Sequence, residues 1–183
     1  MRTAMRARLR VRQVVNLANG STLAGLGVAA LGGARIARSA DGLFTGTGYR
    51  LTVPPAPAFC LGNVIVTRGD GIDPGSPVFR HEARHATQFA WCGGVIMIPL
   101  YLAAAGVSWA LTGDFGARNV FERQAGLADG GYTDKPLRWV RPAPTGPVVQ
   151  QVSGSGPLAG AAGRLLPGPA SAARAGWTAS PCR

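Results

Sequence analysis

After residue 34 the apolar residues come in short runs separated by turn-forming residues, as expected for a small β-structure. An Asp41-Gly42 pair, typical of a tight turn, separates two such runs. A β-branched run, Val64 to Val66, follows a Pro-rich interruption and ends at a Gly-Asp-Gly turn. The pattern predicts a hairpin and one more strand, that is, three short strands in a β-meander.

A helix is predicted directly after these strands. Ser76 can cap the free amides of a first turn, and Pro77 suits the first helical position because it has no amide hydrogen to lose. Gly93-Gly94 supplies a stop, since glycine adopts the left-handed conformation that ends many helices. The helix is therefore expected to run to about Cys92.

A second helix is predicted in the stretch from Ala86 to Gly113, which contains no charged residue. With Pro99 at its start and Leu111 near its end, this helix would be about 20 Å long, short of the roughly 30 Å hydrocarbon thickness of a bilayer. The length favours an apolar core helix. A start near Val95 would approach spanning length and leaves a membrane-embedded helix as the alternative.

A third helix is expected to begin at Asp114, which can act as its cap, and to end at Asp129-Gly130-Gly131. It carries Glu122. Beyond it, residues 137–183 are rich in Pro, Gly, Ser and Ala and are predicted to be a disordered tail.

The first 34 residues place five arginines before an uncharged stretch diluted by asparagine, serine and threonine. This pattern favours a basic, amphipathic helix lying on the domain or on a membrane surface, with a cleaved signal segment as the alternative. The predicted organisation is therefore residues 1–34 as this helix, 35–136 as one α+β domain, and 137–183 as the tail.

Composition narrows the function classes. The 183-residue chain has a formal charge of +11, carried almost entirely by scattered arginines, without interleaved aromatics or a nucleic-acid-binding fingerprint. We therefore expect no specific nucleic-acid partner. Three cysteines, Cys60, Cys92 and Cys182, have neither a CxxC spacing nor an even number, so a reducing, cytoplasmic location is expected, with membrane association left open.

Both histidines of the chain lie in one short motif, "HEARH", with His81 and His85 four residues apart. On a helix this spacing puts two imidazoles on one face, where they can bind one zinc ion. Glu82 lies next to His81 around the helix, where its carboxylate can act as general base toward a water that the metal activates. A surface helix with two histidines is the alternative interpretation.

The third metal ligand is expected to be Glu122, the only other glutamate. It lies among apolar residues, where an unpaired carboxylate is costly to bury and a metal would offset the cost. Pairing with Arg118, four residues earlier, is the competing explanation. Asp129 and Asp114 are weaker candidates for the third ligand.

Five further residues are candidates to support the site. Gln88 lies on the face of His85, Asn119 could orient Glu122 or bond to backbone, and Asp129 could hold a histidine's other nitrogen. Tyr101 and Tyr132 could each donate to an oxyanion, although packing is the simpler role for both.

With these residues assigned, the chain resembles the zincin metallopeptidases of the gluzincin type, in which HExxH is completed by a downstream glutamate. It is also similar to small bacterial HExxH proteins with the same layout, over about residues 35 to 135. The resemblance implies a zincin-like fold, zinc held by His81, His85 and Glu122, and Glu82 as base. It also implies a strand near residues 62–68 at the sheet edge, beside a peptide substrate. Gly126 departs from the usual ExxxD form.

The hypothesis from sequence is a zinc-dependent hydrolase, a metallopeptidase acting on a peptide or protein. The alternative keeps the zinc without turnover, in an interaction protein that associates peripherally with a membrane. Substrate and oligomeric state are not encoded in any pattern that we can interpret.

Overall fold

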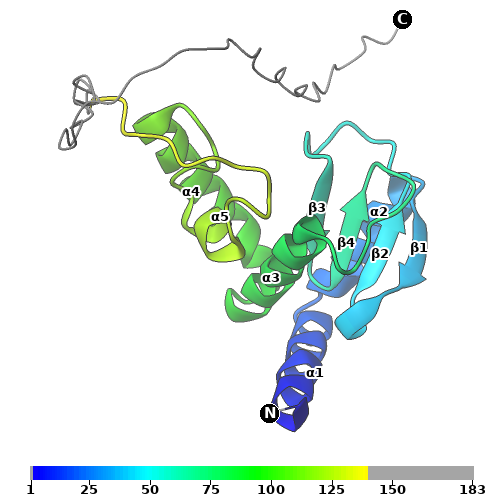
Figure 1. Ribbon diagram of the computed structural model, residues 1–183. Coiled ribbons are helices and arrows are strands. Elements are labelled where there is room, and N and C mark those ends of the chain that lie inside the picture. The colour runs from blue at the N-terminus through cyan, green and yellow to red at the C-terminus, as the bar shows by residue number, and fades with distance from the viewer. Residues whose placement is uncertain (1, 140–183) are drawn as a thin grey trace, which may run out of the picture. The chain divides into compact units, whose positions relative to one another are not determined.

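The computed structural model describes residues 2–139, and its fold is α+β, as predicted (Figure 1). Two single 3₁₀ turns, Ala40–Gly42 and Gly94–Ile96, join the regular elements. These elements, in chain order, are α1 (Arg2–Ala18), α2 (Ser21–Leu31), β1 (Arg35–Arg38), β2 (Phe44–Thr47), β3 (Ala58–Leu61), β4 (Val64–Thr67), α3 (Pro77–Trp91), α4 (Met97–Thr112) and α5 (Val120–Ala125).

The four strands form one mixed sheet in the order β1-β2-β4-β3. The predicted hairpin is confirmed, because β1 and β2 are antiparallel, with Arg35 opposite Thr47. The predicted meander is wrong: β4 pairs parallel with β2 and antiparallel with β3. All four β4 residues are buried, and a strand that is apolar on both faces is stable only inside a sheet. The strand predicted at the edge near residues 62–68 is therefore central, and β1 and β3 are the two edge strands.

Strand β4 divides the core into two parts. Val64 and Val66 pack with Ala29 of α2 on one face of the sheet. Ile65 packs with Phe79 of α3, among others, on the opposite face. Alternation of side chains along the strand produces this division, so that α2, the sheet and α3 form three layers. Figure 1 shows α3 crossing one face of the sheet beside β3.

The N-terminal 34 residues form two helices, so the single predicted helix is wrong. The axes of α1 and α2 differ by 72°. Gly20 lies between them with φ 78°, in the left-handed region that favours glycine. The buried Asn16 side chain donates to the Ala86 carbonyl of α3 at 2.7 Å and to Asn63 Oδ1 at 3.0 Å, which fixes α1 against the core.

Helix α3 has the ends expected from its sequence. Ser76 Oγ accepts from the amide of Phe79 at 3.2 Å, and Pro77 is the first helical residue. Gly93 has φ 75° just after the helix. The buried face of α3 carries His81, Glu82 and His85, so capping and packing together set where these side chains point.

Helix α4 differs from the predicted core helix. It begins at Met97, before Pro99, and only Met97, Ala105 and Ser108 of its residues are buried. The apolar residues run all round this helix, while the fold covers only one side of it. The prediction of a buried core helix is therefore wrong.

Helix α5 begins later than predicted. Its cap is Asn119, whose Oδ1 accepts from the amide of Phe121 at 3.0 Å. Asp114 instead caps the preceding turn, where it accepts from the amides of Gly116 and Ala117. The predicted disordered tail lies outside the described residues from position 140 onward.

Candidate metal centre

Helices α3 and α5 bring together three side chains of types that can bind a metal. His81 Nε2 lies 3.0 Å from Glu122 Oε2 and 3.0 Å from His85 Nε2, while His85 Nε2 lies 3.7 Å from Glu122 Oε1. All three residues are buried. The i, i+4 spacing aligns the imidazoles, and α5 packs on α3 to supply the carboxylate. The group could hold a metal ion.

The partners of the two outer ring nitrogens determine which nitrogens can bind a metal. His81 Nδ1 lies 3.0 Å from the Gly126 carbonyl, which only accepts, so this nitrogen carries the proton. His85 Nδ1 lies 2.7 Å from Gln88 Oε1. The orientation of that amide follows from its Nε2, which donates to the Phe121 carbonyl at 2.9 Å.

Both Nε2 atoms of the neutral histidines are therefore bare lone pairs that face one another. Glu122 Oε2 lies beside them and has no hydrogen-bond donor among residues 2–139. Lone pairs and a carboxylate converging in a buried site repel one another unless a cation lies between them. Donors about 2.0–2.1 Å from a tetrahedral zinc lie about 3.4 Å apart, close to the spacings found here. The residues present fit the implied metal.

Charge in the metal-free site follows from the same contacts. Burial disfavours the imidazolium of His81, but a proton on its Nε2 would point at Glu122 Oε2, 3.0 Å away, and this contact together with the neighbouring carboxylates raises the pKa of His81. Burial also penalises the Glu122 carboxylate, yet its contacts with such an imidazole N–H and with the Tyr101 hydroxyl lower its pKa to about 2. The metal-free site thus holds a charged Glu122 and attracts a proton, which a metal cation would replace.

Glu82 lies next to the ligand group and is not part of it. Its side chain is buried, and its Oε2 has no hydrogen-bond partner among residues 2–139. Burial raises the pKa of this carboxyl group, while the nearby histidines oppose the shift. A buried carboxylate without a donor is costly to maintain, so its persistence here points to a role toward a bound molecule.

The candidate supporting residues have different outcomes. Gln88 contacts His85, as expected. Asn119 bonds to backbone as the cap of α5 and does not orient Glu122. Asp129 pairs with Arg84 at 2.8 Å and holds no histidine, because the Gly126 carbonyl takes that position at His81. Arg118 pairs with Asp134 at 3.4 Å, which removes it as the partner of Glu122.

Tyr101 has a different role from the oxyanion donor considered in the sequence analysis, and Gly130 was not predicted as a site residue. The Tyr101 hydroxyl of α4 donates to Glu122 Oε1 at 2.5 Å, so this tyrosine orients the carboxylate. Gly130 lies against the His81 ring, and a Cβ at this position would lie 2.5 Å from Cε1 of that ring. In the sequence, the Gly130-Gly131 pair indicates the end of a helix, and no pattern indicates that Gly130 contacts His81.

Gly130→Ala is expected to weaken metal binding. The added methyl must displace the His81 imidazole from the position that its Gly126 hydrogen bond fixes, and disturbed support of a ligand costs about 10–100-fold in metal affinity. Competition of the purified protein with a zinc-binding dye measures this. Gly106→Ala is the matched control, because a Cβ there meets no atom within 4 Å. Equal affinities for both variants and the wild type would show that Gly130 does not support the site.

The ligand group forms one wall of a cleft of about 650 Å³. Apart from the ligand group, Glu82 and the tyrosines, the residues that line the cleft are mostly apolar. They come from α2, from strand β3, from the loop that follows β2, and from α4. Edge strand β3 lies along it. Cys60 also lines the cleft, but burial strongly raises the pKa of its thiol, so it remains protonated and is a poor nucleophile.

Comparison of the chain with family models, with curated proteins and with solved structures finds no match. What the site does must therefore be argued from its own residues.

Proposed function

We propose that this chain is a zinc-dependent peptidase, related to the gluzincin type that its motif resembles. The observation that carries the proposal is the pairing of two groups in one cleft. One is the cation-binding group His81, His85 and Glu122, and the other is the buried, unpartnered carboxylate of Glu82. A structural zinc site needs only the first of these groups.

Zinc is the metal that this donor set favours. Two imidazole nitrogens and one carboxylate leave a fourth position open, which distinguishes catalytic zinc sites from closed structural ones. When bound, zinc would supply a Lewis acid that polarises a carbonyl and lowers the pKa of water. Gln88 and the Gly126 carbonyl hold the imidazoles in the tautomer that such binding requires.

The chain's own groups then account for the proton transfers of amide hydrolysis. The Glu82 carboxylate accepts a proton from the attacking water as the new C–O bond forms. It returns that proton to the amine nitrogen as the C–N bond breaks. Tyr132 lines the cleft, and burial raises the pKa of its hydroxyl, so it stays protonated and can donate to the developing oxyanion.

The substrate is expected to bind as an extended chain. Strand β3 is an edge strand of the sheet, pairs only with β4 among the described strands, and lines the cleft. Its free edge can hydrogen-bond the backbone of a peptide, while side chains of that peptide enter the apolar cleft. This arrangement supports a peptide substrate over a small amide.

The test is metal content followed by metal-dependent hydrolysis. Full-length protein purified without a histidine tag is expected to bind one zinc ion per chain, measured by atomic emission. It should cleave peptides in an unbiased peptide mixture, read by mass spectrometry. Chelation should stop cleavage, and added zinc should restore it. Absence of zinc, or cleavage that survives chelation, would contradict the proposal.

A further inference from the structure

The mouth of the cleft is ringed by exposed apolar side chains, which we call the apolar rim. Each of these residues is 40% to 81% exposed, and each also lines the cleft. Exposed apolar residues scattered singly need no explanation, but a contiguous set around one opening marks an interaction surface. The apolar rim consists of Leu31, Leu51, Val53, Val78, Ile98 and Leu102.

The apolar surface continues from the apolar rim along α4. Ile98 and Leu102 belong to the apolar rim, and Leu100, Val107 and Trp109 extend it, all between 41% and 62% exposed. None of the α4 residues is charged. The segment Gly94–Thr112 is long and apolar enough to cross a membrane, and only 22% of its 18-residue apolar window is buried. A helix in water would carry polar residues on so wide an exposed face.

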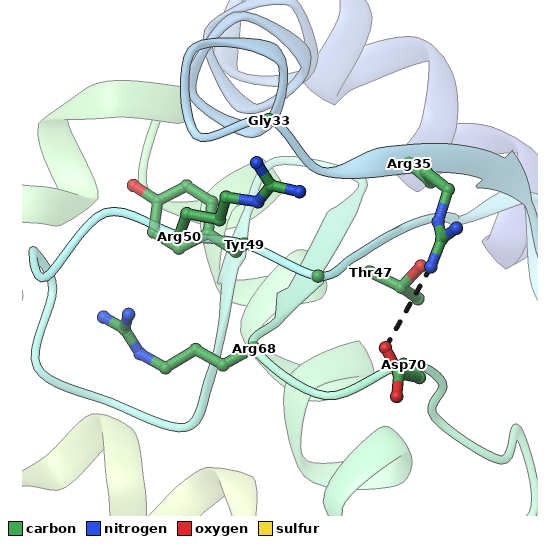
Figure 2. A pocket seen from close by; sticks show the side chains of 8 residues that line it. Gly33, Arg35, Thr47, Tyr49, Arg50, Arg68 and Asp70 are labelled. Atoms are coloured by element: carbon green, nitrogen blue, oxygen red, sulfur yellow. Dashed lines mark ion pairs between the residues drawn. The ribbon is translucent and has the colours of Figure 1, made fainter. Parts of the chain in front are cut away.

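A basic pocket borders the same rim. Figure 2 shows Arg35, Arg50 and Arg68 around a cavity of about 380 Å³. The amide of Arg50 donates to the Gly32 carbonyl at 3.0 Å, which joins the segments that carry Leu31 and Leu51. Apolar groups beside cationic ones are complementary to an anionic bilayer surface, where acyl chains lie just below phosphates.

The three arginines have different local roles. Arg68 donates to the carbonyls of Pro54 and Ala56 and so shapes the loop that carries part of the rim. Arg35 makes only a loose pair with Asp70, at 4.0 Å between two highly exposed side chains. Arg50 is exposed. Of these three arginines, Arg35 and Arg50 are therefore the two able to contact lipid phosphate.

The inner side of α4 argues for a helix lying in the membrane surface. Tyr101 bonds to Glu122, and Ser108 Oγ donates to the Asp114 carbonyl and accepts from the Arg118 amide. A charged carboxylate beside the middle of a spanning helix would lie at the depth where burial of charge costs most. Only the outer side of α4 is suited to lipid.

We propose that the chain docks on an anionic lipid bilayer through the apolar rim and the outer face of α4, with Arg35 and Arg50 contacting lipid phosphates. The cleft then opens at the membrane surface. If the proposed peptidase function holds, on which this last step rests, its substrates are apolar segments of membrane-bound polypeptides.

The test is flotation of the full-length protein with preformed vesicles. Binding is expected to vesicles of phosphatidylcholine with about one third phosphatidylglycerol, and more weakly to phosphatidylcholine alone. Leu102→Glu with Val107→Glu should lower the bound fraction about tenfold or more, because two apolar contacts become charged. Arg35→Ala with Arg50→Ala should reduce binding to anionic vesicles to the level seen with neutral ones.

Matched controls separate this proposal from the peptidase proposal. Ile36→Glu places a charge on an exposed apolar residue of β1 that lines neither the cleft nor the basic pocket, and should bind vesicles like the wild type. Glu82→Gln should also bind normally, whether or not hydrolysis is found. Unchanged zinc affinity in the rim variants verifies their folding. Failure of the wild type to float, or equal losses in Ile36→Glu, would overturn the docking proposal.

Discussion

Glu82→Gln is expected to abolish peptide hydrolysis while zinc remains bound. Glutamine has the shape of glutamate and can fill the same buried space, but its amide cannot accept the proton of the attacking water. Loss of a positioned general base costs about 10²–10⁴-fold in rate. The ligand group does not include Glu82, so zinc content per chain should not change. Single-turnover cleavage and atomic emission measure the two quantities on one sample.

The control for this variant is Asp129→Asn, which neutralises another acidic side chain near the motif. Asp129 pairs with Arg84 on the outside of α3, and both side chains are partly exposed. An exposed ion pair contributes little, so the rate should stay within about twofold of the wild type. Hydrolysis that persists in Glu82→Gln would show that Glu82 is not the general base, or that a contaminating enzyme is present. Zinc without any hydrolysis in the wild type would favour the non-catalytic interpretation.

The grouping of the candidate metal ligands could be predicted because histidine and glutamate are scarce in this chain. The chain has two histidines, and it has only two glutamates, Glu82 and Glu122. A helix fixes the relation between His81 and His85 locally, so their spacing alone predicted a shared face. Glu122 was predicted as the third ligand because an unpaired carboxylate in an apolar segment is costly to bury and so needs a partner.

The supporting contacts could not be predicted because they depend on how α4 and the loop after α5 pack. Tyr101 contacts Glu122 only because α4 packs across α5. Gly130 contacts His81 only because the chain after α5 folds back over α3. Neither contact leaves a periodic signal in the sequence.

The errors in the fold have a related origin. The run Val64 to Val66 predicted a strand, yet its lack of alternation, which indicates burial on both faces, was not used to place that strand centrally. Short strands joined by turns favour a meander locally, and only the tertiary fold brings β4 parallel to β2. For α4, the apolar composition predicted a helix, but the side of the helix that the rest of the fold covers depends on elements elsewhere in the chain.

Glu122→Gln is expected to remove most zinc affinity. The substitution keeps the shape of the side chain and an oxygen that can accept from Tyr101, but it removes the charged ligand. The loss should exceed the roughly 10–100-fold that follows removal of a supporting residue. Zinc competition measures it, with Asp129→Asn as the control that should keep full affinity. Wild-type affinity in Glu122→Gln would mean that another group completes the site.

The same substitution should also reverse the protonation of the metal-free site. With Glu122 present, the pKa of His81 is raised; without that charge the pKa should fall, because the largest contributions that oppose the effect of burial are removed. A raised His81 pKa contributes stability that is present below about pH 6.5 and lost as pH rises through the folded-state value. The lowered Glu122 pKa contributes stability that is present above about pH 4.5 and lost as pH falls toward about 2.

The pair therefore stabilises the metal-free wild type most between these limits, from about pH 4.5 to 6.5. Glu122→Gln should lose that excess stability, measured by urea unfolding across pH. Nitrogen NMR can follow the His81 titration directly, because the chain has only two histidines. An unchanged His81 pKa in Glu122→Gln would show that the two side chains do not interact in solution. The site would then lack the carboxylate on which its third metal bond depends.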